Sequence, residues 1–214
     1  MIALAAAAAL ALPATGVAVE RHGAVQLLRL DGHVARTLPG WRLAPAFGTR
    51  VGPVYLRDRS RHVWKLEHGA LARLVRLPRP RFSDGCFSTA ARTRICGYPY
   101  GPGPSRVLVG DRVVPGSERK YGHWLAVDVS RDGRLLAQWS GICEIPTAYV
   151  GDVHRIRAAI YPTIESLALG WAGEQPVYAF PVGGCGEWFD HPGVYLARTR
   201  IAPLRRGDVA ELWR

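Results

Sequence analysis

The sequence predicts an all-β protein built from a repeated sheet unit. Three observations support this: helical periodicity is scarce, short apolar runs alternate with turn residues, and the stretch at 125–143 recurs at 167–185. Beyond residue 19, no window of about a dozen residues keeps apolar positions at the helical period, and Pro or Gly interrupts almost every segment. We therefore expect strands rather than helices beyond that point.

Strands are expected where apolar, β-branched and aromatic residues gather between turn-forming pairs. Asp-Gly, His-Gly and Gly-Asp separate these runs, and such pairs favour tight hairpin turns. The expected strands cover residues 24–30, 53–58, 62–77, 105–114 and 124–130.

An internal repeat sets the expected architecture. Residues 125–143 align without a gap on residues 167–185, at a constant offset of 42. A period of this length, with three or four short strands in each copy, is typical of a propeller blade. We predict a small or partial β-propeller of four to five antiparallel blades; the alternative is a chance likeness between hairpins. The matched pairs are Leu125 and Leu167, Ala126 and Ala168, Ala137 and Ala179, Gly141 and Gly183, and Cys143 and Cys185.

The segment SRDGR, residues 130–134, is expected to form the hairpin turn of its copy. Gly133 accepts a positive φ at little cost, and the Asp132 carboxylate can bond the local backbone. Trp139, on the strand that follows, fits packing between blades better than a ligand platform. Residues 54–77 read as a degenerate third copy, in which DRSRH, residues 58–62, occupies the place of SRDGR.

These residues carry a resemblance to TolB-type and WD-like β-propellers of exported bacterial proteins. The blade pattern S-x-D-G-x-x-L-A followed by V-Y is matched at Ser130, Asp132, Gly133, Leu136 and Ala137, and more loosely at Val194, Tyr195 and Leu196. The matches cover about half of the chain and imply a fold rather than an activity. Members of the family commonly have six or seven blades, so the shorter chain implies a small ring, a fragment, or an open array closed by a partner.

Residues 1–19 resemble a secretory signal, with an apolar centre, small residues at the end and plausible cleavage near Ala18. They lack a basic start, so either the true start lies upstream, or the segment is a weak export signal or a clipped membrane anchor. We expect residues 20–214 to form one propeller-like domain of an exported protein, whether secreted, periplasmic or at the cell surface. No transmembrane segment is expected beyond the leader.

Four cysteines occur, with no C-x-x-C pair and no zinc-module spacing. Behind an export signal, disulfides are the favoured interpretation, and four buried free thiols are the alternative. Cys143 and Cys185 occupy equivalent positions in consecutive copies, so we expect a bridge between them. Cys86 and Cys96 are then expected to bridge locally.

The formal net charge is +11, from 28 basic and 17 acidic residues. This excess could serve a polyanion. However, 26 of the basic residues are Arg and they are dispersed, with Arg57, Arg59 and Arg61 among the nearest to a cluster. A solvated basic surface is the favoured interpretation, and nucleic acid is not an expected partner.

Candidate binding residues gather in two loops of the repeat. The segment after Cys185 holds Glu187, Trp188, Asp190 and His191, and Glu144 lies at the equivalent place in the preceding copy, shortly before Tyr149. Loops on a rigid β-scaffold commonly carry binding residues. The plainer alternative is that Trp188 plugs a blade edge while the acids are solvated or paired with Arg.

No catalytic motif is found: histidines at metal spacing, a G-x-S-x-G segment and a phosphate-binding loop are all missing from the sequence. We therefore expect neither cofactor nor metal, and we predict a non-catalytic binding or scaffolding module with a protein or carbohydrate ligand. The first alternative is a carbohydrate-acting enzyme that uses Glu144, Glu187 or Asp190. The second is a polyanion-binding protein that uses the arginine-rich surface.

Overall fold

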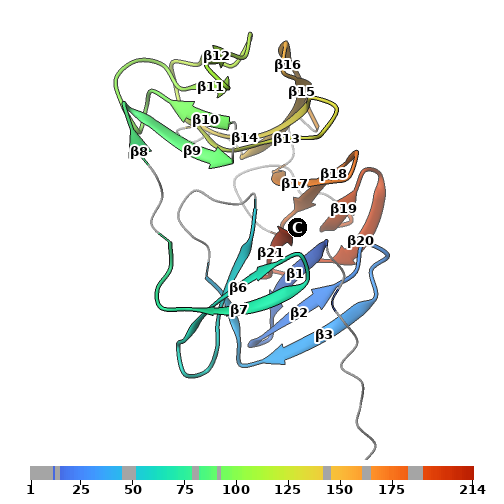
Figure 1. Ribbon diagram of the computed structural model, residues 1–214. Helices are drawn as coiled ribbons and strands as arrows, with labels where there is room; N and C mark the ends of the chain where they lie inside the picture. The colour runs from blue at the N-terminus through green and yellow to red at the C-terminus, as the bar shows by residue number, and fades with distance from the viewer. Residues whose placement is uncertain are drawn as a thin grey trace, which may run out of the picture.

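The computed structural model is an all-β propeller of five blades, each a small antiparallel sheet (Figure 1). This confirms the predicted fold class and sets the number of blades at five. The part of the chain that the structure describes contains no helix long and apolar enough to span a membrane. The described residues are 12, 15–44, 52–78, 82–90, 93–141, 146–160, 165–182 and 190–214.

Blade 1 is made from both ends of the described chain. Its strand order is β21-β1-β2-β3, so the last strand pairs with the first. Gly16 lies opposite Trp213, and Glu20 lies opposite Val209. The C-terminal segment is therefore the strand that completes the sheet of blade 1. The strands are β21 (Val209–Trp213), β1 (Gly16–Arg21), β2 (Ala24–Leu28) and β3 (Val34–Pro39).

The boundary of the expected leader falls within β1. Val17, Ala18 and Val19 are fully buried in this strand. Cleavage near Ala18 would remove residues that pair β1 with β21.

Blades 2 and 3 follow along the chain. Blade 2 comprises β4 (Arg42–Leu43), β5 (Val54–Arg57), β6 (Val63–Glu67) and β7 (Ala70–Leu74). Blade 3 has the order β12-β11-β10-β9-β8, with β8 (Phe82–Ser83), β9 (Cys86–Ala90), β10 (Thr93–Cys96), β11 (Arg106–Val109) and β12 (Arg112–Val113).

The expected third copy of the repeat differs from the structure by one strand position. The turn at residues 58–62 joins the second and third strands of blade 2, whereas the turn at residues 130–134 joins the first and second strands of blade 4. The two turns share their local hydrogen bonds, which is why they align, but they occupy different places in their blades.

Blades 4 and 5 confirm the predicted repeat. Leu125 and Leu167 lie in their first strands, and Ala137 and Ala179 lie in their second. The strands are β13 (His123–Val129), β14 (Arg134–Ser140), β15 (Thr147–Asp152) and β16 (Arg155–Ala159) in blade 4, and β17 (Leu167–Ala172), β18 (Gln175–Phe180), β19 (Gly193–Leu196) and β20 (Thr199–Pro203) in blade 5.

The core consists of apolar layers between neighbouring blades. Separate clusters join blade 1 to blade 5, blade 1 to blade 2, blade 3 to blade 4, and blade 4 to blade 5. Trp139 belongs to the cluster between blades 3 and 4, as expected for a packing residue. Over the residues with defined positions, none of the apolar clusters joins blade 2 to blade 3.

Side-chain acceptors on second strands bind the first strand of the next blade. In blade 1, Glu20 Oε2 accepts the amide of Leu43 at 2.7 Å. In blade 4, Gln138 Oε1 accepts the amide of Ala168 at 2.7 Å. These bonds satisfy backbone donors at the blade junctions that no sheet partner reaches.

Asp128 joins three blades near the centre of the ring. This residue of β13 is 1% exposed, and the Arg214 guanidinium donates to both of its carboxylate oxygens at 2.7 Å. The backbone amide of Trp171, on β17, donates to Asp128 Oδ2 at 2.9 Å. Because Arg214 directly follows β21, one carboxylate connects the first strands of blades 4, 5 and 1.

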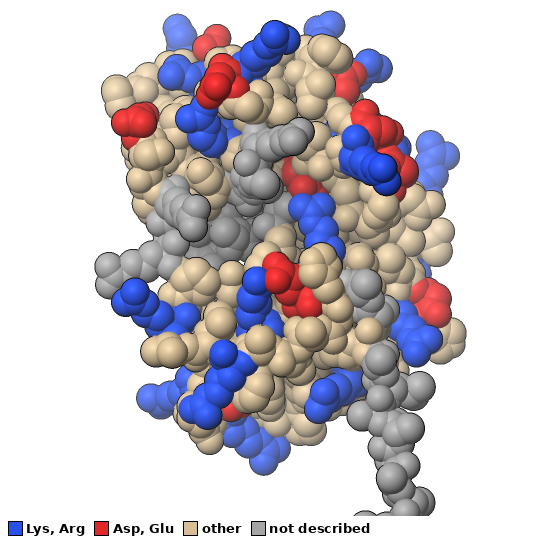
Figure 2. Space-filling model, in the orientation of Figure 1, with Lys and Arg blue, Asp and Glu red and all other residues tan. Residues whose placement is uncertain are grey.

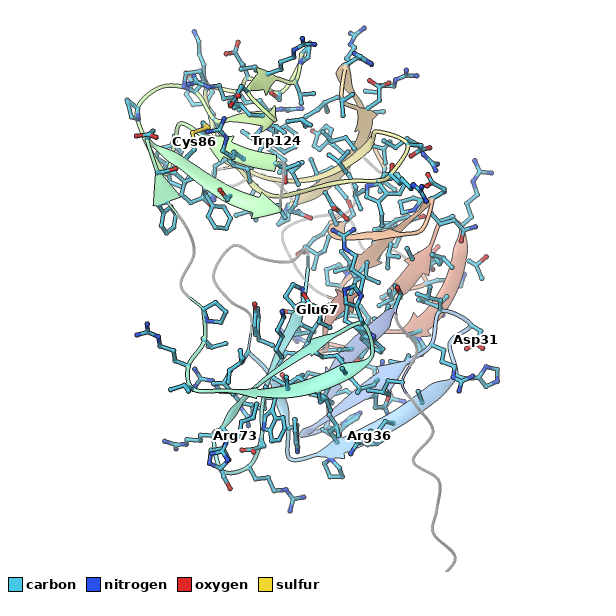
Figure 3. The ribbon with its side chains drawn as sticks, in the orientation of Figure 1. Asp31, Arg36, Glu67, Arg73, Cys86 and Trp124 are labelled. Carbon is cyan, nitrogen blue, oxygen red and sulfur yellow. A yellow bond between two sulfur atoms is a disulfide. The ribbon has the colours of Figure 1, made fainter. Side chains whose placement is uncertain are left out.

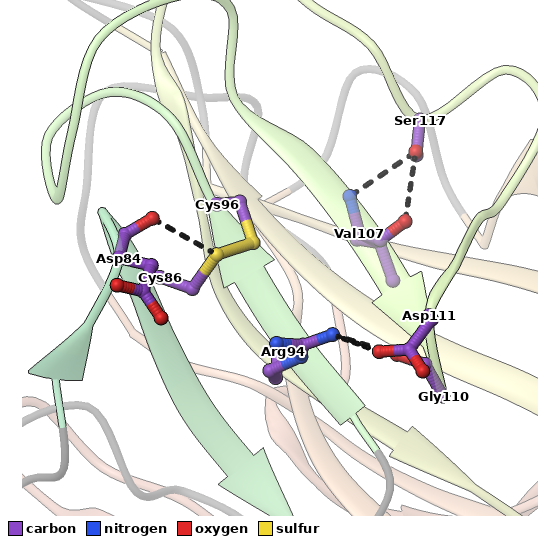
Figure 4. The surroundings of a disulfide bond; sticks show 8 residues. All are labelled: Asp84, Cys86, Arg94, Cys96, Val107, Gly110, Asp111 and Ser117. Atoms are coloured by element: carbon purple, nitrogen blue, oxygen red, sulfur yellow. Dashed lines mark hydrogen bonds and ion pairs between the residues drawn. A yellow bond between two sulfur atoms is a disulfide. The ribbon is translucent and has the colours of Figure 1, made fainter.

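The predicted disulfide between Cys86 and Cys96 is confirmed (Figure 4). The two residues lie opposite each other on β9 and β10, with Cα atoms 4.0 Å apart. The bridge therefore cross-links two paired strands of blade 3. The predicted Cys143–Cys185 bridge lies outside the described residues.

Candidate binding site

The predicted site residues fall into three groups. Glu144, Glu187 and Trp188 lie outside the described residues. Asp190 and His191 are exposed and shortly precede β19. Tyr149 lies on β15 of blade 4 and packs against the apolar cluster between blades 3 and 4.

His191 lines a pocket of about 730 Å³ between blades 4 and 5. The outer strands β15 and β16 form one wall, and β18, β19 and the turn after β19 form the other. Most of the lining is apolar, with one cation at the edge. The lining residues are Val150, Ala159, Ile160, Pro176, Tyr178, Phe180, His191, Tyr195, Ala197 and Arg198.

Three aromatic rings pack together in the blade 5 wall. Tyr178 and Tyr195 are cross-strand partners, and their rings stack with 5.8 Å between centroids and 6° between planes. Phe180 meets both rings edge-on, at 5.4 Å from Tyr178 and 5.3 Å from Tyr195. The period of two along β18 sends Tyr178 and Phe180 to the same face. The wall is therefore rigid and preformed.

Hydrogen bonds fix the two tyrosines. The Tyr195 hydroxyl donates to the backbone carbonyl of His191 at 2.7 Å, and the Tyr178 hydroxyl donates to the carbonyl of Ala197. Each phenolic oxygen keeps lone pairs that can accept a hydrogen bond. Arg198 is exposed at the edge and has no ion pair with another residue of the described chain. A small apolar ligand could thus be oriented by a few polar groups, as is usual in binding pockets.

Tyr149 faces away from this pocket. Its ring lies 4.7 Å from the guanidinium carbon of Arg119, which also lies over Trp124 and Trp139 at 5.4 and 5.0 Å. The next residue, Val150, lines the pocket instead. Alternation along β15 therefore separates Tyr149 from His191, and the aromatic cage that includes Tyr149 is already filled by an arginine of the chain itself.

The side chains with defined positions include no cluster of three His, Cys, Asp or Glu residues suited to a metal ion. His123 is half-buried on β13 with its ring edge-on to Tyr98, and burial lowers the pKa of its imidazole. It lies outside the pocket, so it gives the pocket no acid or base.

The sequence reasoning missed Tyr178 and Phe180, and it treated Tyr195 only as part of the blade motif. The available signal was the alternation in VYAF, residues 177–180, because two aromatic residues at that spacing share one face of a strand. Their partnership with Tyr195 depends on the register between β18 and β19.

The basic side chains are spread over the surface. Figure 2 shows Lys and Arg over the whole of one face, with Asp and Glu between them.

Comparisons with known proteins add no family assignment, since neither any family model nor any curated protein matches the chain.

Proposed function

We propose that this protein is a non-catalytic binding module that receives an apolar, ring-bearing group of a partner protein in the pocket between blades 4 and 5. The observation that carries the proposal is the wall of Tyr178 and Tyr195, backed by the fully buried Phe180, beside an open volume of about 730 Å³. A rigid aromatic wall binds a flat or branched apolar group at a small entropic cost.

Arg198 and the tyrosine oxygens suit a ligand that also carries an anionic or donor group. The guanidinium offers paired donors to a carboxylate. A side chain such as Phe or Trp next to a chain-terminal carboxylate matches this combination of an apolar pocket and a cationic edge.

Export is part of the proposal. It is supported by the signal-like segment at 1–19, the disulfide in blade 3, and the resemblance of the SRDGR blade to TolB-type propellers. Of the carboxylates named for a carbohydrate-acting enzyme, Glu144 and Glu187 lie outside the described residues and Asp190 is exposed.

The test measures binding of small probes by NMR titration. Phenylacetate and indole represent an apolar ring with and without a carboxylate, and cellobiose represents a carbohydrate. Val150→Trp places a large side chain in the pocket, since Val150 lines it and packs toward blade 5. Val113→Trp is the matched control, since Val113 is an exposed valine on β12 of blade 3 that does not line the pocket.

We expect saturable binding of phenylacetate, weaker binding of indole, loss of both in Val150→Trp, and retention in Val113→Trp. Binding of cellobiose alone would replace the proposed ligand with a carbohydrate. Equal binding by both tryptophan variants would show that the pocket is not the site.

A further inference from the structure

Blade 2 contains a second hollow, of about 680 Å³, whose lining is rich in arginine. It lies beside the start of β4 and the turn from β5 to β6. Of its lining residues, Leu43 and Ala44 are buried and all four arginines are exposed. The lining residues are Gly40, Arg42, Leu43, Ala44, Arg57, Asp58, Arg59, Arg61 and Leu77.

Three of these arginines have no side-chain partner among the described residues. Arg42 and Arg57 lie directly opposite each other in the β4–β5 pairing, where like charges destabilise a sheet. The guanidinium groups of these two and of Arg61 form no ion pair or hydrogen bond with another described residue. In other blades of the described chain, arginines form ion pairs with carboxylates: Arg94 pairs with Asp111 in blade 3, and Arg157 pairs with Asp152 in blade 4.

Among the described residues, Asp58 is the only carboxylate that lines the hollow, and its oxygens are already used. Oδ1 accepts the His62 amide at 2.9 Å, and Oδ2 accepts the Trp64 indole at 3.0 Å and faces His62 Nδ1 at 3.1 Å. Burial raises the pKa of Asp58, but these hydrogen bonds outweigh it and lower the pKa overall. The carboxylate therefore stays ionised and fixes the turn, leaving an excess of positive charge around the hollow.

The position of the Arg59 side chain depends on the absence of a side chain at Gly40. Its Nε donates to the carbonyl of Pro39 at 3.1 Å, and its side chain lies across Gly40. A Cβ on Gly40 would come within 2.2 Å of Arg59 Nε, and the φ of Gly40 is +75°. Gly40 is thus needed for the position of this guanidinium, while the turn at residues 58–62 holds the backbone of Arg59 and Arg61.

We infer that this hollow binds an oxyanion of the phosphate or sulfate type, presented by a small molecule or as a group on a larger one. Guanidinium groups bind tetrahedral oxyanions through paired, charge-assisted hydrogen bonds. A multivalent anion between Arg42 and Arg57 would also relieve the repulsion across the β4–β5 pair. This site is separate from the pocket between blades 4 and 5 and does not depend on the function proposed for that pocket.

The test is calorimetric titration of the full chain at low ionic strength with inorganic phosphate, pyrophosphate and a sulfated disaccharide. The first two probes and the third distinguish phosphate from sulfate. The test variant is Arg57→Gln/Arg61→Gln. The matched control is Arg36→Gln/Arg73→Gln, which removes the same charge from exposed arginines of blades 1 and 2 that do not line the hollow (Figure 3).

We expect pyrophosphate or the sulfated probe to bind the wild type and the control alike, and to bind the test variant at least tenfold more weakly. Gly40→Ala, which displaces Arg59 without changing the charge, should weaken binding several-fold. Thermal unfolding of each variant in the absence of probe checks that it is folded.

Three results would overturn the inference. They are a lack of binding by all three probes, an equal loss in the test and control variants, and an unchanged affinity in the test variant. A short DNA duplex serves as a further arm. If it binds with a steep dependence on salt that the two double variants weaken equally, the basic surface acts as a whole and the hollow is not a site.

Discussion

Replacing Asp128 with Asn tests whether the central carboxylate couples the blades. The substitution keeps the size of the side chain but removes its charge. Asn can still offer one oxygen to the Trp171 amide, but its NH₂ group cannot accept the donors of Arg214. The bidentate contact between β13 and the residue after β21 is therefore lost, while the apolar layers are unchanged.

The expected cost follows from the burial of the pair. Removing one partner of a buried ion pair costs about 3–5 kcal/mol. The Asp128 side chain is 2% exposed and the Arg214 side chain 33% exposed, so water can solvate the released guanidinium. We therefore expect the lower end of that range, a loss of about 3 kcal/mol in the free energy of unfolding. For a chain of this size, that loss lowers the melting temperature by about 6–12 °C.

The assay is urea unfolding followed by tryptophan fluorescence. Urea is preferred to guanidinium chloride because a salt would screen the ion pairs under comparison. Asp111→Asn is the matched control: Asp111 also pairs with an arginine at 2.6 Å, but its side chain is 99% exposed. We expect the control to change stability by less than about 1 kcal/mol. If both variants unfold at the same urea concentration as the wild type, the coupling argument is wrong.

Two further predictions concern blade 3 and the SRDGR turn. Replacing both Cys86 and Cys96 with Ala should lower the free energy of unfolding by about 2–3 kcal/mol in urea, and reduction of the wild type should have a similar effect; a double variant as stable as the oxidised wild type would contradict this. The pKa of Asp132 is lowered to about 2, chiefly by a hydrogen bond from the Ser130 hydroxyl. Because the folded state favours the carboxylate, this contribution is complete above pH 4 and is lost as the pH falls towards 2. The stability difference between wild type and Asp132→Asn should accordingly close over that interval, and a difference that stays constant from pH 5 to pH 2 would disprove the assignment.

The repeat could be predicted because two consecutive copies keep their strand positions. Leu125 and Leu167 occupy first strands, and Ala137 and Ala179 occupy second strands. The match is one of strand position and not of flank, because Ala137 packs toward blade 3 and Ala179 toward blade 1. Blade 3 gave no such signal. It has five short strands and a disulfide in place of a repeated pattern, so the number of blades was not determined by sequence alone.

The misplaced third copy shows why a turn alone does not locate a strand. In residues 130–134, the amide of Ser130 donates to the carbonyl of Arg134, and that of Gly133 to the carbonyl of Ser130. In residues 58–62, Asp58 and His62 are related in the same way. These bonds are local and depend on a few consecutive residues. The place of the turn within a blade depends instead on which strands pair on either side of it.

Both candidate pockets depend on contacts that sequence spacing does not encode. The pocket between blades 4 and 5 brings β16 against β18 through the packing of two sheets. In the arginine-lined hollow, Arg57, Arg59 and Arg61 were visible as a cluster, but Arg42 joins them only through the register of β4 with β5. Local clusters are therefore predictable, and the partner strand that completes them is not.

The C-terminal segment, residues 209–214, explains how a short chain can hold five blades in a ring. Its strand β21 pairs with β1 in blade 1, Trp213 is fully buried in the cluster shared with blade 2, and Arg214 binds Asp128 of blade 4. One short segment thus contacts three blades. The described apolar layers connect blade 2 through blades 1, 5 and 4 to blade 3. Trp213 packs between blades 1 and 2, and Arg214 binds blade 4. The C-terminal segment therefore contacts blades that lie apart in this series of layers.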